Sequence, residues 1–129
     1  MSWSIAQLAR MSKVTSRTLR HYDEVGLVPP SARSEGGFRL YTEADVDRLN
    51  TIRRMKPLGF TLEEMRRLLD AVQVLGDPDR PAAERQSAAR AVEGCHQKAR
   101  QSRDRLRRHL GYAEELIGLL ADLAARRAP

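Results

Sequence analysis

Cysteine is almost absent from this 129-residue sequence, in which Cys95 stands alone. A single thiol excludes an intramolecular disulfide framework and supplies too few ligands for an iron–sulfur centre. The sequence also lacks the run of about 18 apolar residues that a membrane-spanning helix needs. Its N-terminus has no apolar signal region. These absences predict a cytoplasmic protein with no membrane partner.

Aromatic residues make up only 5% of the sequence, so its core must rest on Leu, Val, Ile and Ala. The three histidines, His21, His96 and His109, fall on different predicted helices. No spacing places a Ser/His/Asp or Cys/His catalytic arrangement together. Adjacent residues on a helix point about 100° apart, so Cys95 and His96 do not form a ready chelate. We therefore expect no enzyme, no cofactor and no metal site.

Positive charge is in excess, with a net charge of +6 and a sequence pI near 10.2. Its distribution is uneven, because the segment from Met1 to Tyr22 has no acidic residue and four basic ones, Arg10, Lys13, Arg17 and Arg20. A basic patch of this kind favours a polyanionic partner, with nucleic acid as the main candidate.

The N-terminal segment has the pattern of a helix-turn-helix. Ser4–Gln7 has the form of a capping box, and apolar residues at helical spacing follow it, which predicts a first helix near Ile5–Arg10. Thr15 is a suitable N-cap for a second helix, Ser16–Glu24, in which Leu19 can face inward while polar and basic residues face outward. The second helix would be the recognition helix.

A short β-hairpin is predicted next. Gly26 can adopt the left-handed conformation that ends a helix, and Pro29-Pro30 forces extended backbone. Extended pieces at Val28–Arg33 and Phe38–Tyr41 flank a Gly36-Gly37 pair, which supplies the positive φ of a tight turn.

Two further helices follow the hairpin. Thr42 and the acidic residues after it cap a third helix, Pro57 ends it, and Thr61–Glu64 is a second capping box that opens a fourth. The apolar stripe of the third helix is Val46, Leu49, Ile52 and Met55. The fourth helix is expected to bury Leu62, Met65, Leu68, Leu69 and Val72.

The C-terminal segment reads as one long amphipathic helix. The turn-rich stretch 76–81 predicts a linker between a domain at 1–75 and a helical region at 82–129. A helix with one apolar stripe needs a partner, and a second copy of the chain would suit it. Gly94 marks a point where the helix could break. The stripe has heptad-like gaps with one extra residue and consists of Ala88, Val92, Cys95, Ala99, Ser102, Leu106, Leu110, Ala113, Ile117, Leu120 and Ala124.

Three segments together resemble the MerR family of transcriptional regulators: Asp23–Pro30, Ser34–Tyr41 and Leu58–Glu64. The resemblance covers roughly Ser4 to Asp70. It implies a mainly α fold, namely a winged helix-turn-helix domain of four helices and a β-hairpin wing. A long helix that dimerises as an antiparallel coiled coil would follow. It also implies a homodimer on a palindromic promoter operator, which distorts the double-stranded DNA so that RNA polymerase can engage an over-long promoter spacer.

The expected DNA contacts come from the recognition helix, the hairpin and the turn after the third helix. Arg39 and Tyr41 are assigned by the resemblance. The resemblance also implies that the turn after the third helix acts as a second wing, although Pro57 in this turn departs from the family pattern. The full set is Thr15, Ser16, Arg17, Arg20, His21, Tyr22, Arg39, Tyr41, Arg54 and Lys56. The expected dimer contacts are Val92, Cys95, Ala99, Leu106, Leu110, Ala113, Ile117 and Leu120.

Several assignments have an alternative that the sequence leaves open. Tyr41 could belong to the core, and Trp3 could staple the first helix or lie against DNA. Arg53 and Arg54 could be charges that suit a helix end. Cys95 could be a core residue or a sensor thiol. Some MerR relatives bind metals through several cysteines around the dimer helix, whereas Cys95 has no such companion.

Two other functions remain open at this point. One is a ligand-independent repressor or architectural DNA-binding protein. The other is a protein-interaction module that acts through the C-terminal helix. DNA binding through several phosphate contacts would weaken steeply with salt, whereas association between helices would change little.

Overall fold

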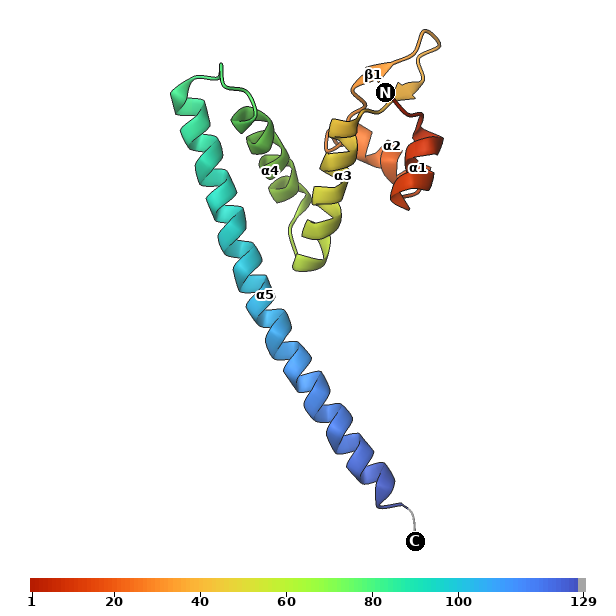
Figure 1. Ribbon diagram of the computed structural model, residues 1–129, viewed down its shortest axis with the longest axis vertical. Helices are drawn as coiled ribbons and strands as arrows, with labels where there is room; N and C mark the ends of the chain where they lie inside the picture. The colour runs from red at the N-terminus through yellow and green to blue at the C-terminus, as the bar shows by residue number, and fades with distance from the viewer. Residues whose placement is uncertain (128–129) are drawn as a thin grey trace. The chain divides into compact units, whose positions relative to one another are not determined.

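Helices dominate the computed structural model, which describes residues 1–127 (Figure 1). The order of the elements is α1 (Ile5–Ser12), α2 (Ser16–Glu24), β1 (Ala32–Arg33), β2 (Arg39–Leu40), α3 (Glu43–Met55), the 3-10 helix η1 (Lys56–Leu58), α4 (Leu62–Leu75) and α5 (Ala82–Ala125). The predicted fold class, a mainly helical winged helix-turn-helix with a long C-terminal helix, is confirmed.

The first two helices begin at the caps that the sequence supplies. The Ser4 hydroxyl accepts the Gln7 backbone N–H at 3.2 Å, and the Gln7 side chain accepts the Ser4 N–H at 2.9 Å. The Thr15 hydroxyl accepts the Thr18 N–H at 3.1 Å, which starts α2. Since each bond satisfies an N–H that the helix itself cannot, these caps fix where α1 and α2 begin. The predicted bounds of the recognition helix are confirmed.

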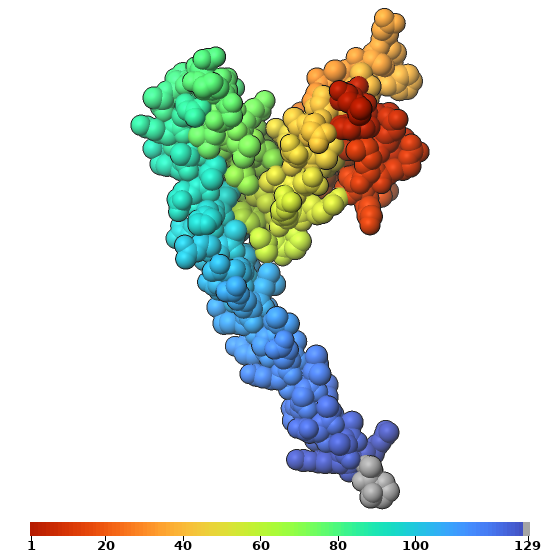
Figure 2. Space-filling model, in the orientation of Figure 1, coloured from red at the N-terminus to blue at the C-terminus, as the bar shows by residue number. Residues whose placement is uncertain are grey.

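The hairpin is shorter than the sequence predicted. Its strands pair in antiparallel register, Ala32 with Leu40 and Arg33 with Arg39. Gly37 has a positive φ, as predicted, with a value of 80°. Two backbone hydrogen bonds of 2.8 Å join Trp3 to Tyr41 and extend this pairing to the N-terminal segment. Figure 2 shows the hairpin protruding from the surface. It therefore has the form of a wing.

The core of the N-terminal part is mainly aliphatic, and its buried aromatic residues are Tyr22, Tyr41 and Phe60. Its fully buried side chains come from α1, α2, α3 and the segments that flank the hairpin: Leu8, Leu19, Leu27, Val28, Tyr41 and Ile52. From α4 the buried residues are Met65, Leu69 and Ala71. The prediction that Leu62 and Val72 are buried is wrong, because their exposed fractions are 36% and 54%. Residues 65, 69 and 72 share one face of α4. Other residues cover only part of that face, so Val72 stays exposed.

The chain divides into two compact units, Met1–Cys95 and His96–Pro129. The first unit contains the beginning of α5, where Ala88 is buried. The Arg85 guanidinium donates to the carbonyls of Val74 and Asp77, at 3.4 and 2.6 Å, and so ties the start of α5 to the preceding turn. Helix α5 runs through Gly94 without the break that the sequence had suggested.

Candidate nucleic-acid interface

One face of α2 gathers basic side chains at the surface. Arg17, Arg20 and His21 are exposed, and their spacing of three and four residues puts them on neighbouring positions of the helix. Leu19 is fully buried and anchors α2 in the core. Among residues 1–127, neither Arg17 nor Arg20 forms an ion pair. Both guanidinium groups are thus available to an external anion. Thr15 is exposed and Ser16 half-buried at the start of the same helix.

Tyr22 does not belong to this exposed face, and the prediction that it faces outward is wrong. Its exposed fraction is 5%, because it lies three residues after Leu19 and shares the buried side of α2. The Lys56 ammonium lies 5.1 Å from the centre of the Tyr22 ring, which is a cation–π distance. Lys56 itself is exposed and connects η1 to the recognition helix.

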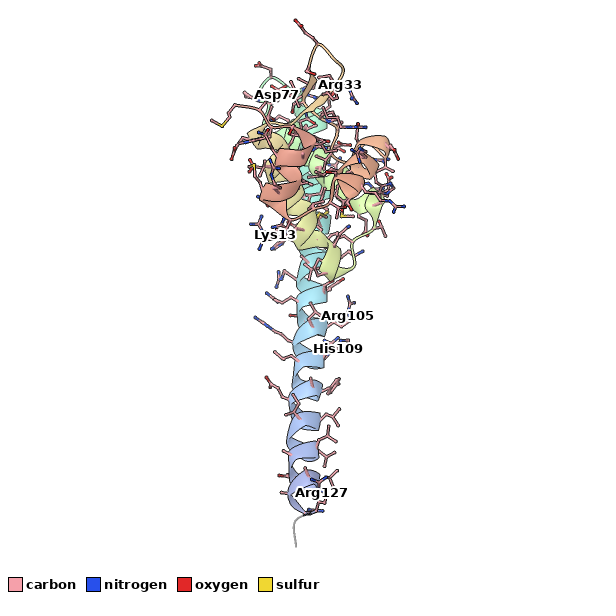
Figure 3. The ribbon with its side chains drawn as sticks, turned by 90° about the vertical axis from the view of Figure 1, so that its right-hand side faces the viewer. Lys13, Arg33, Asp77, Arg105, His109 and Arg127 are labelled. Atoms are coloured by element: carbon pink, nitrogen blue, oxygen red, sulfur yellow. The ribbon has the colours of Figure 1, made fainter. Side chains whose placement is uncertain are left out.

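The two wing strands are joined to α2 through one carboxylate. Asp23 Oδ2 accepts a hydrogen bond from Arg39 Nε at 2.8 Å and another from Arg33 Nη2 at 3.1 Å. The hydrogen bond to Asp23 raises the pKa of Arg39 above its ordinary value, against the opposing effect of burial. Figure 3 labels Arg33 on the hairpin. The cluster holds two positive charges and one negative, so it keeps a net positive charge beside the recognition helix.

Tyr41 lies in the core, and its predicted role as an exposed partner of DNA phosphates is wrong. Its side chain is fully buried, and its hydroxyl has no hydrogen-bond partner within the described residues. The paired backbones of Trp3 and Tyr41 fix this position. Burial raises the pKa of the Tyr41 hydroxyl above its usual value. Arg39 remains half-buried at the surface, although the two residues lie two apart on one strand.

Three arginines outside the predicted set of DNA contacts hold the ends of α1 and α2. Each donates to a backbone carbonyl near a helix C-terminus, where the last carbonyls lack partners in the helix. The pairs are Arg48 with Leu27, at 2.8 Å, Arg53 with Ser12, and Arg66 with Val25. No local signal in the sequence could have found these contacts, because they join residues 21 or 41 positions apart. Arg54, like Arg53, is exposed.

The C-terminal helix carries the second candidate surface. Of the predicted dimer contacts, Val92, Cys95 and Ala99 are half-buried. From Leu106 onward the apolar side chains are exposed, with exposed fractions of 59% for Leu110, 67% for Ile117 and 53% for Leu120, and Ala113 is also exposed. In Figure 3 the side chains of Arg105 and His109 project from this part of α5. Single exposed leucines are ordinary, but a continuous exposed stripe marks an interaction surface.

Within residues 1–127, no helix is both long enough and apolar enough to cross a membrane.

Comparison with known proteins matches most of the chain to one family. The model for the MerR HTH family regulatory protein matches residues 3–72, and the model described as MerR, DNA binding matches residues 46–126. The transcriptional activator TipA of Streptomyces coelicolor is 51% identical over 70 residues, which are 54% of this chain and 28% of TipA. The nodulation protein NolA of a Bradyrhizobium species is 40% identical over 105 residues, which are 81% of this chain and 42% of NolA. The chain thus spans less than half the length of these two curated relatives.

A solved structure agrees with this match. The N-terminal part of MtaN, the multidrug transporter activator of Bacillus subtilis, is 30% identical and superposes with a TM-score of 0.56. That comparison covers 93% of this chain and 95% of the MtaN chain. Since the first family model alone matches more than half of the sequence, the chain belongs to the MerR family of helix-turn-helix regulatory proteins.

Proposed function

We propose that the protein is a sequence-specific transcriptional regulator that binds a palindromic promoter operator as a homodimer. The observation that carries the proposal is the pair of exposed guanidinium groups of Arg17 and Arg20, which form no ion pair within the described part of the chain, on a helix anchored by buried Leu19. An arginine can read guanine through two hydrogen bonds in the major groove or contact a phosphate. Membership of the MerR family supports the same conclusion.

The proposed DNA surface consists of α2, the wing and the turn after α3. Arg17 and Arg20 contact bases or phosphates, and the other members position the protein on the backbone. Tyr22 and Tyr41 leave the set because both are buried. The remaining contacts are Thr15, Ser16, His21, Arg39, Arg54 and Lys56, which are all exposed or half-buried.

The exposed stripe of α5 supports a homodimer through an antiparallel coiled coil. If Leu110 packs against the partner's Leu120, the same register sets Ala113 against the partner's Ile117 and Leu106 against the partner's Ala124. This register pairs apolar side chains along residues 106–124 of both copies.

The proposed mechanism is distortion of the operator. Two recognition helices held at a fixed separation by the coiled coil would bend or untwist the DNA between them, so that the deformability of the sequence contributes to specificity. RNA polymerase then becomes the second macromolecular partner at the promoter. Such a role places the protein in the cytoplasm, where the promoter DNA of a bacterium lies.

The exposed apolar stripe also favours a second candidate, a module that binds a different protein through α5. Titration of a fluorescent random-sequence duplex with the full chain at increasing salt separates the two. DNA binding through about five phosphate contacts per subunit predicts a log–log slope near −4 to −5 per subunit. Absence of binding at low salt, or binding with a slope near zero, would contradict DNA binding and leave the interaction module.

A further inference from the structure

Asp23 lies in the last turn of the recognition helix, where a negative charge opposes the helix dipole. Its side chain is only 16% exposed, so the carboxylate has also lost most of its hydration. Both costs require compensation. Arg39 Nε at 2.8 Å and Arg33 Nη2 at 3.1 Å supply it, and both donate to the same oxygen.

The two arginines come from opposite strands of the wing, at the paired positions Arg33 and Arg39. Arg33 also donates to the Gly37 carbonyl at 3.2 Å, in the turn of the hairpin. One carboxylate of α2 therefore holds both strands, and through Arg33 it is connected to the turn. A two-stranded hairpin alone is marginally stable in water, so an external support of this kind fixes where the wing lies relative to α2.

The same contacts withhold positive charge from DNA. A guanidinium that is engaged by a carboxylate has fewer free donors for a phosphate, and a phosphate close to Asp23 meets repulsion. Random DNA offers phosphates alone, whereas an operator also offers base contacts to α2. On the operator, base contacts fix where α2 and the wing lie, whereas on random DNA the protein can shift toward the phosphates that attract it most. Weakening phosphate attraction at the wing therefore lowers affinity for random DNA by a larger factor than affinity for the operator.

We propose that Asp23 is a specificity-determining residue that positions Arg33 and Arg39 and limits their attraction to non-operator DNA. The inference rests on the proposed DNA-binding function. It assigns to an acidic residue of the recognition helix a role in discrimination that acts through the two arginines it holds.

The test compares Asp23→Asn with Glu24→Gln in the full chain. Glu24 is the next residue, is exposed, and affects Arg39 less than Asp23 does, so its substitution removes the same charge without releasing an arginine. Affinities for a random-sequence duplex and for an operator selected by the wild-type protein are measured from 0.1 to 1 M salt. Each additional phosphate that the Asp23→Asn variant neutralises should tighten random-duplex binding about eightfold at 0.1 M relative to 1 M.

The operator should gain less than the random duplex in Asp23→Asn, so the specificity ratio falls, whereas Glu24→Gln leaves the salt slope unchanged. Adding Arg39→Gln to Asp23→Asn should return the slope toward that of the wild type. Equal slopes for Asp23→Asn and Glu24→Gln, or an unchanged specificity ratio, would overturn the role in discrimination.

A measurement without DNA separates this inference from the proposed function. In the nuclear magnetic resonance spectrum of the free protein, the Arg39 Nε–H should exchange slowly with water in the wild type and in Glu24→Gln. It should exchange rapidly in Asp23→Asn. Slow exchange in Asp23→Asn would refute the positioning role even if DNA binding is confirmed. If the exchange pattern is as expected but the protein binds no DNA, the positioning role of Asp23 is retained. The proposed function and the role in discrimination are then refuted.

Discussion

Arg17 lies on the exposed face of α2 and forms no ion pair with any residue from 1 to 127, which makes it the simplest side chain through which to test reading of the operator. Arg17→Ala should weaken operator binding by about 1–3 kcal/mol and relax the base preference at one position. Competition titrations with operator and random duplexes would measure both effects. Arg90→Ala removes an exposed arginine from α5 and serves as the control. An equal loss on both duplexes would reassign Arg17 to a phosphate contact.

Tyr41 tests the opposite case, a candidate DNA contact that the fold has buried. Since its hydroxyl has no partner among the described residues, Tyr41→Phe should leave operator affinity unchanged and leave the free energy of unfolding unchanged or raise it by up to about 1 kcal/mol. A loss of operator affinity without loss of stability would show that the hydroxyl reaches DNA.

The same variant has a predicted pH dependence. The pKa of Tyr41 is raised above its ordinary value of 10.0, chiefly by burial, so the unfolded chain releases this proton first. The stability contributed by the neutral phenol is complete below pH 10 and falls as pH rises through the folded-state pKa. Denaturant titrations above pH 10 should therefore show a steeper loss of stability for the wild type than for Tyr41→Phe. Parallel curves would contradict this assignment.

At the scale of elements, the ends of α1 and α2 depend on arginines from α3 and α4. Arg48→Met removes the 2.8 Å hydrogen bond to the Leu27 carbonyl and should lower the free energy of unfolding by about 1–2 kcal/mol, measured by urea denaturation. Arg67→Met, an exposed position on α4, is the matched control and should change stability little. Similar values for the two variants would show that the Arg48 contact does not stabilise the fold.

Local signals in the sequence were sufficient to place the helices. Thr15 and Thr61 cap α2 and α4 as predicted, because an N-cap bond involves residues only three apart. The burial of Tyr22 follows from its spacing of three residues after Leu19, although the prediction placed it outward, whereas the burial of Tyr41 could not be obtained from local signals. Periodicity shows which residues share a face, but which face is covered depends on distant contacts such as that between Trp3 and Tyr41.

The same limit applies to the candidate site. The basic face of α2 follows from residue spacing and was predicted, whereas the contact of Asp23 with Arg33 and Arg39 spans 10 and 16 residues and depends on the register of the hairpin. Gly94 illustrates the converse, since its low helix propensity did not interrupt α5.

At the scale of the whole molecule, the proposed dimer depends on the apolar stripe of α5. Leu110→Asp would bury a charge in the seam and should convert dimers into monomers and abolish tight operator binding. Arg108→Asp introduces the same residue two positions earlier, off the stripe, and should remain dimeric. Sedimentation equilibrium measures the masses. Dimers of Leu110→Asp would show that this stripe is not the interface.

The central claim is that two copies joined through α5 present two recognition helices to one DNA duplex. Selection of bound duplexes from a random library by the full chain, followed by sequencing, tests it most directly. The account predicts enrichment of an inverted repeat whose two half-sites keep a fixed spacing. Enrichment of a single half-site, or of no motif at all, would contradict it.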